Sequence, residues 1–233
     1  MLTLFAWGPT GWGDELAAGL TITVRLAVAA YALGLVIGVG GAAAALSRVW
    51  PLRRLALGYA AVGRAVPELL VIFLIFYGGN QALRATLSLV GYPQPVEVSA
   101  FVGGVVALGV IAGAAATAIF RGAILAVEPG QREAAQAFGL SGRHTFVLVV
   151  LPQAWRLALP GLTNVWMGLL KETALVSVVG LEDLLRVARI AEGATHEPLP
   201  FLLAAGVGYL VLTGVSLVLL RRLARVMEAP YRA

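Results

Sequence analysis

Five long apolar segments, separated by shorter polar connections, dominate the pattern of this chain. They cover about residues 16–46, 55–77, 98–127, 154–179 and 199–223. Each reaches or exceeds the roughly 20 residues that cross a hydrocarbon core of about 30 Å. Because unpaired backbone groups are too costly in lipid, all five are expected to be helices. The pattern predicts an all-α, polytopic membrane bundle of five transmembrane helices, forming a single domain over residues 1–233.

Composition supports this class. The chain is 60% hydrophobic and 12% charged, whereas soluble domains carry roughly 25% charged residues. A net charge of +5 would also suit a nucleic-acid-binding protein, but orientation in a membrane explains the basic residues better. The chain has no cysteine, which excludes disulfides and thiolate metal sites. Its two histidines, His144 and His196, stand apart in polar connections.

The placement of arginines predicts the orientation of the bundle. One set of connections contains Arg48, Arg53, Arg54, Arg121, Arg132, Arg143, Arg156, Arg221, Arg222, Arg225 and Arg232. The opposite set contains Arg84, Arg186 and Arg189. Connections rich in arginine stay in the cytoplasm. We therefore expect the amino terminus outside and the carboxyl terminus inside.

The two longer outer connections differ in kind. Residues 78–97 contain Gly-Gly, Pro93 and Pro95, which is typical of a turn-rich loop. Residues 181–191 place apolar side chains at helical spacing, which predicts an amphipathic helix on the outer surface. That helix either contacts a binding protein or covers the end of the bundle.

A motif lies in the cytoplasmic connection between the third and fourth segments. It consists of Glu133-Ala134-Ala135, then Gly139 after three residues, Val149 after nine more, and Leu151-Pro152 after one more. This spacing resembles the EAA loop of bacterial ATP-binding-cassette (ABC) importer permeases. The resemblance extends to Arg64-Ala-Val-Pro67-Glu-Leu-Leu70, Phe76-Tyr77-Gly78, Leu159-Pro160-Gly161, Thr173–Ser177 and Gly180–Asp183. Within this family, the chain most resembles one permease subunit of the histidine, lysine, arginine, ornithine and opine importers.

The resemblance implies the fold, the mechanism and the partners. The fold would be that of a type I ABC importer permease in the bacterial cytoplasmic membrane, working by alternating access. Two separate ATPase subunits would hold ATP and Mg, with no cofactor in this chain. A second permease, identical or homologous, would complete the pathway, and an unlike pair is favoured. An external amino-acid binding protein and membrane lipid are the other expected partners, and nucleic acid is not.

In that family a loop corresponding to about residues 128–153 docks onto the ATPase. Here Glu133 is expected to begin a helix, where a carboxylate suits the positive helix end. Small Ala134-Ala135 would let that helix sit deep in the partner's groove, and Gly139 would end it in a left-handed conformation. Leu140-Ser141 would start a second short helix. Pro152 would mark the turn back towards the membrane.

Polar groups and helix breaks inside the spans are the candidates for the substrate pathway, because each is costly in lipid. They are Pro67, Leu70, Ala115, Thr117, Ala118, Asn164, Lys171, Glu172 and Thr173. Lys171 and Glu172 either line the pathway or pair with each other near its outer mouth. Thr117 faces the pathway or bonds to its own helix. Pro67 is expected to break or bend the second span.

Ala115 and Ala118 stand where the family usually has an aromatic residue and a glutamate. This departure predicts a bulkier or less cationic amino-acid derivative as substrate, or recognition by an unlike partner subunit. It also puts the basic amino-acid specificity of the family in doubt for this subunit.

Two other classes of membrane protein would require features that can be sought in the sequence. An ion-coupled amino-acid carrier would need its own ion site and, commonly, inverted repeats. An intramembrane enzyme would need a nucleophile–base pair or metal ligands. The sequence contains no convincing repeat, no such catalytic set and no phosphate-binding GxxxxGK[ST] loop. It therefore predicts a non-enzymatic permease subunit that moves polar amino acids or their derivatives.

Overall fold

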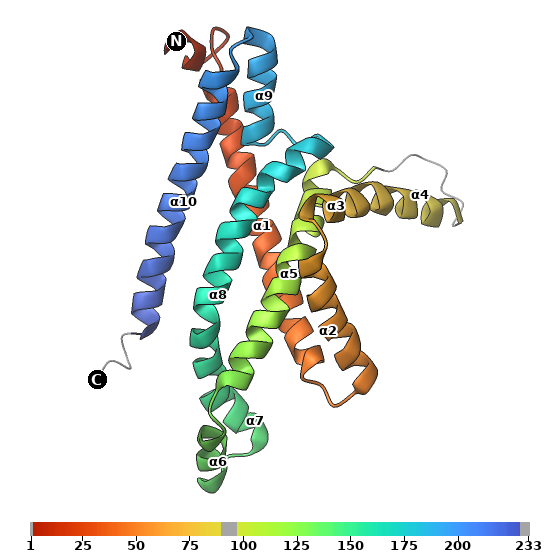
Figure 1. The fold of residues 1–233 in the computed structure, drawn as a ribbon, viewed down its shortest axis with the longest axis vertical. Helices are drawn as coiled ribbons and strands as arrows, with labels where there is room; N and C mark the ends of the chain where they lie inside the picture. The colour runs from red at the N-terminus through yellow and green to blue at the C-terminus, as the bar shows by residue number, and fades with distance from the viewer. Residues whose placement is uncertain (1, 90–96, 229–233) are drawn as a thin grey trace.

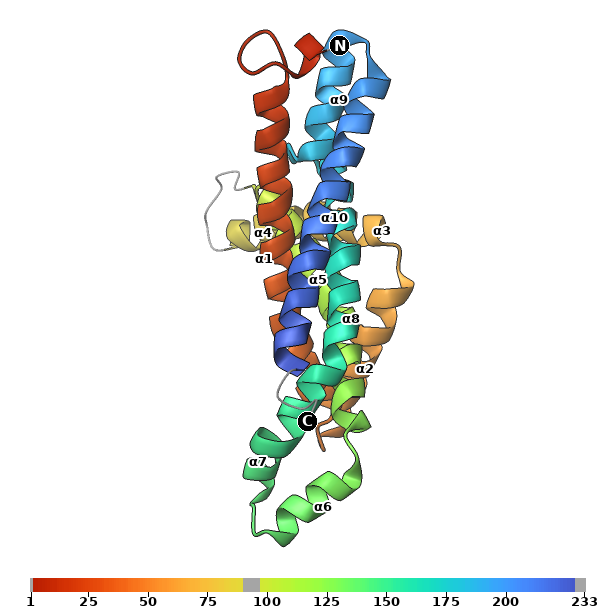
Figure 2. The same cartoon turned by 90° about the vertical axis from the view of Figure 1, so that its left-hand side faces the viewer.

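The computed structural model of the protein describes residues 2–89 and 97–228, which form helices and their connections with no strand among them (Figure 1). The α-helices are α1 (Gly13–Ala45), α2 (Trp50–Ala65), α3 (Glu68–Phe73), α4 (Gly79–Leu89), α5 (Ala100–Ala126), α6 (Pro129–Ala137), α7 (Gly142–Thr145), α8 (Leu151–Glu172), α9 (Leu184–Thr195) and α10 (Pro198–Glu228). Figures 1 and 2 place α9 and the amino terminus at one end of an elongated bundle, and α6 and α7 at the other.

Five helical stretches in the described residues are long and apolar enough to cross a membrane, which confirms the all-α class and the number of spans. They are Gly13–Ala45, Glu68–Leu89, Ala100–Ala126, Gly142–Val179 and Pro198–Arg222. The first, third and fifth lie close to their predicted positions. The fourth begins well before its predicted start at residue 154, because the π-helical segment Phe146–Val150 joins α7 to α8 without a break.

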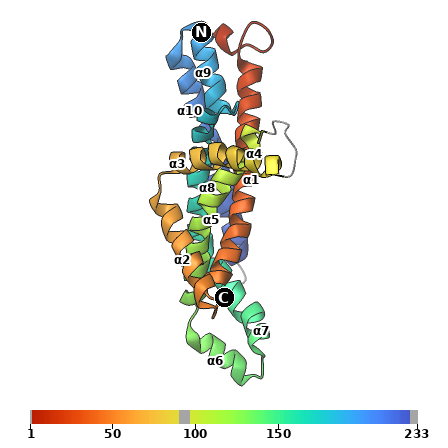
Figure 3. The same cartoon turned by 90° about the vertical axis from the view of Figure 1, so that its right-hand side faces the viewer.

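The second span is where the sequence prediction was wrong. Its predicted helix over residues 55–77 is interrupted at Val66, whose backbone is extended (φ −85°, ψ 134°). The residue before a proline avoids helical angles, so Pro67 ends α2 and a new helix starts at Glu68. Figures 1 and 3 show α3 and α4 running across the long axis of the bundle.

The predicted turn-rich loop over residues 78–97 is also wrong in its first part. Gly79–Leu89 is helical and forms α4. A π-helical segment, Leu74–Gly78, connects it to α3, so the Gly-Gly pair lies inside continuous helix. Pro93 and Pro95 lie outside the described residues.

Small residues bring α1 and α5 into close contact along their lengths. A Cβ added at Gly34 would lie 2.8 Å from the Ala112 Cβ. One added at Gly38 would overlap the Ala116 Cβ and lie 3.2 Å from the Ala116 carbonyl carbon. The spacing of four residues therefore serves a contact within the chain, in which the two backbones approach each other as they do at small-residue interfaces in membranes.

Two tyrosines tie further helices to this pair. The Tyr59 hydroxyl on α2 donates a hydrogen bond to the Val110 carbonyl on α5 (2.6 Å). The Tyr31 hydroxyl on α1 donates to the Leu162 carbonyl on α8 (3.1 Å). Interhelical hydrogen bonds of this kind stabilise helix association in lipid by about 1 kcal/mol, so α2 and α8 are held in register with the α1–α5 core.

The predicted amphipathic helix over residues 181–191 is confirmed as α9, which begins three residues later, at Leu184. Its apolar face packs against Leu16 of α1 and Phe201 of α10 through Leu184, Val187, Ala188 and Ala191. Ile190, which also belongs to the apolar positions of the predicted helix over residues 181–191, is exposed. The helix thus covers the end of the bundle formed by α1 and α10.

Replacing Gly38 with Ala tests the α1–α5 contact. We expect Gly38→Ala to lower the free energy of unfolding by about 1–3 kcal/mol, because the added methyl group must displace Ala116. Gly40 lies two residues along the same helix with no atom within 4 Å of an added Cβ. Gly40→Ala should therefore be neutral or slightly stabilising, since Ala favours helix. Thermal unfolding of both variants in the same detergent measures the difference, and equal melting temperatures would contradict the packing argument.

Candidate functional site

A tight turn between α6 and α7 shapes the segment that resembles the coupling loop. Gly139 has a φ of 81°, in the left-handed region as predicted. Its N–H donates to the Gln136 carbonyl (2.9 Å), and the Leu140 N–H donates to the Ala135 carbonyl (3.1 Å). These two bonds form a Schellman motif, which satisfies the last carbonyls of α6. Ser141 then caps the N-terminus of α7, as its side chain accepts from the His144 N–H.

Three expectations for this segment need correction. α6 begins at Pro129, so Glu133 lies beyond its first turn and does not start the helix. Ala135 is buried against its own chain rather than offered to a partner. Pro152 does not mark a turn, because it lies near the start of α8, inside the continuous helical stretch Gly142–Val179. Glu133 and Ala134 remain exposed.

Phe138 is the residue of this segment that the sequence analysis missed. It directly precedes Gly139, and its side chain is 90% exposed. An aromatic residue before the helix-ending glycine of a polar loop was the available signal. Aromatic side chains are enriched at protein interfaces, and Phe138 is the large apolar side chain that α6, α7 and the turn between them leave most exposed.

The α6–α7 segment is attached to the bundle by polar side chains. The Arg132 guanidinium donates to the Ile124 carbonyl near the end of α5 (2.8 Å). Gln153 on α8 donates to the Val149 carbonyl (2.9 Å) and reaches Gln131 of α6 (3.5 Å). Because α6 bonds to both α5 and α8, a displacement of α6 would be transmitted to two spans.

A cavity of about 370 Å³ opens between α5 and α8, within the membrane-spanning part of the bundle. Ala115 and Ile119 line it from α5, and Asn164, Gly168 and Glu172 line it from α8. Its volume lies at the lower end of the range for small-molecule sites, about 300–1,000 Å³. The structure therefore brings together three predicted pathway residues, Ala115, Asn164 and Glu172.

The charged groups near this cavity do not neutralise one another by direct contact. The Glu172 carboxylate lies over Gly168, where an added Cβ would meet its Oε1 at 3.4 Å. Lys171 is exposed and, in the described part of the chain, forms no ion pair with Glu172. Glu68 and Lys171 both lie near enough to act on Glu172 electrostatically. The alternative in which Lys171 and Glu172 pair is therefore not realised in this structure.

Two predicted pathway residues point elsewhere. Thr117 is fully buried, donates to the Gly113 carbonyl of its own helix (2.8 Å) and packs against Gly41 of α1. Thr173 is also fully buried and donates to the Leu170 carbonyl (2.8 Å). Both hydroxyls satisfy their own helix, so neither lines the cavity.

The remaining pathway candidates lie beside the cavity rather than in its wall. Ala118 is half-buried on α5, and Pro67 and Leu70 are exposed at the start of α3. None of the three is among the residues that line the 370 Å³ cavity. α3 nevertheless places Glu68 within electrostatic range of Glu172, so this short helix borders the same region.

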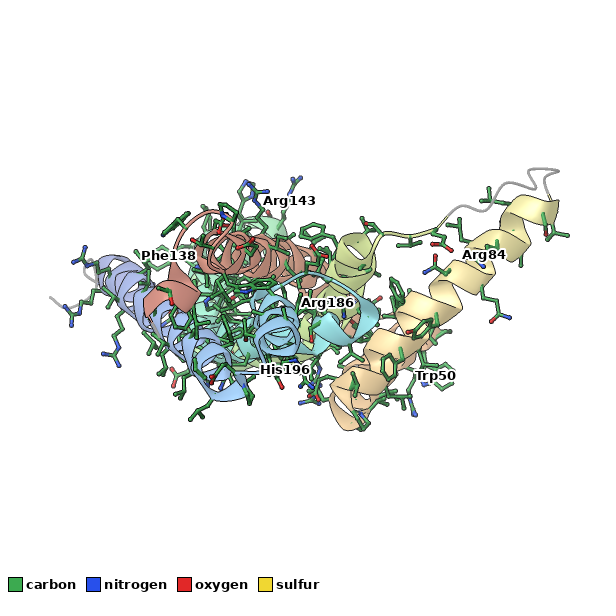
Figure 4. The ribbon with its side chains drawn as sticks, turned by 90° about the horizontal axis from the view of Figure 1, so that it is seen from above. Trp50, Arg84, Phe138, Arg143, Arg186 and His196 are labelled. Carbon is green, nitrogen blue, oxygen red and sulfur yellow. The ribbon has the colours of Figure 1, made fainter. Side chains whose placement is uncertain are left out.

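A second polar cluster lies where α9 begins, within the bundle and away from α6 and α7. Asp183 is fully buried, caps α9 by accepting from the Arg186 N–H (3.0 Å), and accepts from the Tyr209 hydroxyl (3.4 Å). Burial raises the pKa of the Asp183 carboxyl to about 6. Figure 4 shows Arg186 over the bundle and Arg84 far out along α4. Among the described residues, no three His, Cys, Asp or Glu side chains gather as a metal site would require.

Comparison with known proteins identifies the family to which this chain belongs. Residues 34–229 match the family described as "Binding-protein-dependent transport system inner membrane component". The chain is 49% identical over 216 residues to the nopaline transport system permease protein NocQ of Agrobacterium fabrum, an alignment that covers 92% of each protein. It is 40% identical over 206 residues to the histidine/lysine/arginine/ornithine transport system permease protein HisQ of Salmonella typhimurium, covering 88% of this chain and 90% of HisQ.

A solved structure agrees with these relatives. The crystal structure of an amino acid ABC transporter with histidines superposes with a TM-score of 0.79 at 32% identity, and covers 92% of this chain and 94% of the matched chain. The inward-facing MetNI methionine ABC transporter shares the fold, with a TM-score of 0.69 at 18% identity. The chain therefore belongs to the binding-protein-dependent transport system inner membrane component family and is a membrane permease subunit of an ABC importer, with ATP hydrolysis residing on a separate subunit.

Proposed function

We propose that this subunit imports polar amino acids or opine-type amino-acid derivatives by alternating access, driven through the α6–α7 segment by separate ATPase subunits. The observation that carries the proposal is the Schellman turn at Gly139, which presents Phe138 at the end of the bundle farthest from α9. Two ATPases, an external binding protein and a second, unlike permease complete the importer.

The substrate class rests on the relatives and on the cavity. Nopaline, octopine and basic amino-acid permeases are each at least 39% identical to the chain over most of its length. The cavity combines the Glu172 carboxylate and the Asn164 amide with the small side chain of Ala115. A carboxylate attracts a cationic group more strongly where water is scarce, and the small alanine leaves room for a bulkier derivative.

An ion-coupled carrier is the less favoured alternative. In the proposed mechanism ATP binding favours one global state over the other, and the chain needs no ion site of its own. The polar groups of the cavity are assigned to the substrate. Uptake that depends on ATP and persists when ionophores dissipate proton and sodium gradients separates the two mechanisms.

Truncation of Phe138 tests the coupling role. We expect Phe138→Ala to weaken ATPase binding roughly 30-fold, the equivalent of about 2 kcal/mol for a buried aromatic contact. The permease itself should unfold at an unchanged temperature, because the ring is 90% exposed. Titration of the ATPase onto reconstituted permease measures the affinity, and ATP-driven uptake should fall in parallel.

Trp7 provides the matched control for this change, because its ring is 73% exposed near the opposite end of the bundle. Trp7→Ala should leave ATPase binding unaltered. If both variants bind the ATPase as the unmodified protein does, the α6–α7 segment is not the docking element.

Cysteine labelling tests the orientation, and the absence of native cysteines removes any background. A Ser141→Cys variant should react with an impermeant thiol reagent only from the cytoplasmic side, and Thr195→Cys only from outside. The expectation rests on the excess of arginine in one set of connections. The reverse pattern would overturn both the orientation and the ATPase contact.

Labelling also tests the pathway. Ala115→Cys should react with a small water-soluble thiol reagent, and saturating substrate should slow the reaction, because residue 115 lines the cavity. Thr117→Cys is the control, since that side chain is fully buried against α1 only two residues away. Equal reactivity at the two positions, or no protection by substrate, would remove the α5–α8 cavity from the pathway.

A further inference from the structure

The polar cluster around Asp183 takes no part in the coupling segment or the pathway cavity. It joins four elements at the α9 end: α1 through Thr23, the 3₁₀ segment η4 (Thr173–Val179) through Thr173, α9 through Asp183, and α10 through Tyr209. Each of these four side chains makes a hydrogen bond to another element or lies within hydrogen-bonding distance of one. A cluster shared by so many elements has to change if the helices at this end separate.

We propose that Asp183 is a positioning residue for transport, whose protonation from the α9 side locks this end of the permease in the closed arrangement. The proposal rests on the proposed function, because it concerns the rate at which the alternating-access cycle opens this end. It assigns Asp183 a role separate from substrate contact, since its carboxylate lies outside the α5–α8 cavity.

Both oxygens of the Asp183 carboxylate accept hydrogen bonds. One oxygen of Asp183 accepts the Arg186 N–H at 3.0 Å, which caps α9. The other accepts the Tyr209 hydroxyl at 3.4 Å. The next residue, Leu184, donates its N–H to the Thr23 hydroxyl at 3.1 Å. Asp183 and its neighbour therefore hold the start of α9 on both α1 and α10.

Tyr209 also connects the cluster to the helix that lines the pathway cavity. The Tyr209 hydroxyl lies 3.4 Å from the Thr173 hydroxyl. Thr173 directly follows Glu172, whose side chain lines the cavity. A shift of Tyr209 would therefore act on the end of the span that carries Glu172, so the buried cluster is connected to the pathway wall.

Among the described residues, no cation forms an ion pair with Asp183. Arg186, the cation nearest along the chain, directs a guanidinium N–H to the Ser177 carbonyl (3.2 Å), and its Nε is buried without a hydrogen-bond partner. α10 contributes Tyr209, whereas α1 and η4 contribute hydroxyls that do not titrate at these pH values. The nearby acids, Glu15 of α1 and Glu182 before α9, line a neighbouring cavity. Asp183 is thus a buried carboxylate with no ion pair in the described part of the chain.

These surroundings explain why burial raises the pKa of Asp183 to about 6 from a usual value of 3.8. A group with a raised pKa binds its proton more tightly in the buried state than in a hydrated one. The closed arrangement is therefore favoured at low pH, and this advantage is lost as the pH rises through about 6. If opening hydrates Asp183, moving from pH 7 to pH 5 raises the closed-to-open ratio about tenfold.

Uptake into reconstituted vesicles tests the proposal, with the inner pH held constant and the pH on the α9 side varied from 5 to 7. Uptake by the unmodified complex should fall up to about tenfold at pH 5. Asp183→Asn keeps an oxygen that accepts the Arg186 N–H, but its side chain cannot titrate. Uptake by this variant should therefore not show the fall at pH 5. Tyr209→Phe removes a donor to the carboxylate and should move the midpoint to higher pH.

Glu192→Gln is the matched control, because it removes an acid from the same helix without touching the cluster. It should keep the unmodified pH response. An effect of pH on the binding protein would be common to all the complexes and would therefore persist in Asp183→Asn. The proposal is overturned if Asp183→Asn retains the fall at pH 5 or if Glu192→Gln abolishes it.

A labelling experiment separates failure of this proposal from failure of the proposed function, because it needs only the inserted permease. Ser177 is 8% exposed in the cluster region. The labelling rate of Ser177→Cys, normalised to that of exposed Ala194→Cys, should increase between pH 5 and pH 7. The same measurement in an Asp183→Asn background should show no increase. If the normalised rate is independent of pH both with Asp183 and with Asp183→Asn, protonation of Asp183 does not hold the closed arrangement, even if transport itself is confirmed.

Discussion

The close contact between α1 and α5 is the interaction on which the rest of the structure depends. In lipid, apolar side chains gain little by leaving their surroundings, so helices associate through close packing and interhelical hydrogen bonds. Gly34 and Gly38 allow the two backbones to approach until Ala112 and Ala116 fill the space between them. With α5 held in this way, another face of the same helix is left to form the wall of the α5–α8 cavity.

The backbone groups at the ends of α6 and α9 find their hydrogen-bond partners in different ways. At the α6–α7 end, the Schellman turn at Gly139 satisfies the backbone locally, so the segment keeps its shape while Phe138 remains exposed. At the α9 end, Asp183 caps α9 locally, Thr23 of α1 accepts the Leu184 N–H, and Tyr209 of α10 donates to the Asp183 carboxylate, in a buried cluster. The first arrangement leaves a surface for a partner, whereas the second makes the end of the bundle sensitive to any movement between helices.

The cavity alters the argument about charge that the sequence supports. The resemblance to the permease family led us to expect an aromatic residue and a glutamate at the positions of Ala115 and Ala118, and their absence predicted a wall without a carboxylate. The fold places Glu172, from α8, in the same cavity as Ala115. A carboxyl group therefore remains at the site but comes from a different helix, with Glu68 of α3 near enough to act on it electrostatically.

The sequence alone determined the features that depend on local composition and spacing. Apolar length predicted five spans, because lipid demands hydrogen-bonded helices of a minimum length. The spacing around Gly139 predicted a left-handed turn, because glycine occupies that conformation without strain. These constraints act within a few residues and can be read along the chain.

Only the tertiary structure decided which side chains meet. Thr117 and Asn164 are both polar residues in spans, yet one packs against Gly41 and the other lines the cavity. The buried cluster of Asp183, Tyr209 and Thr23 joins residues more than 150 positions apart. No local pattern records such contacts, because they follow from how closely α1, α5 and α8 approach one another and from which face each helix turns inward.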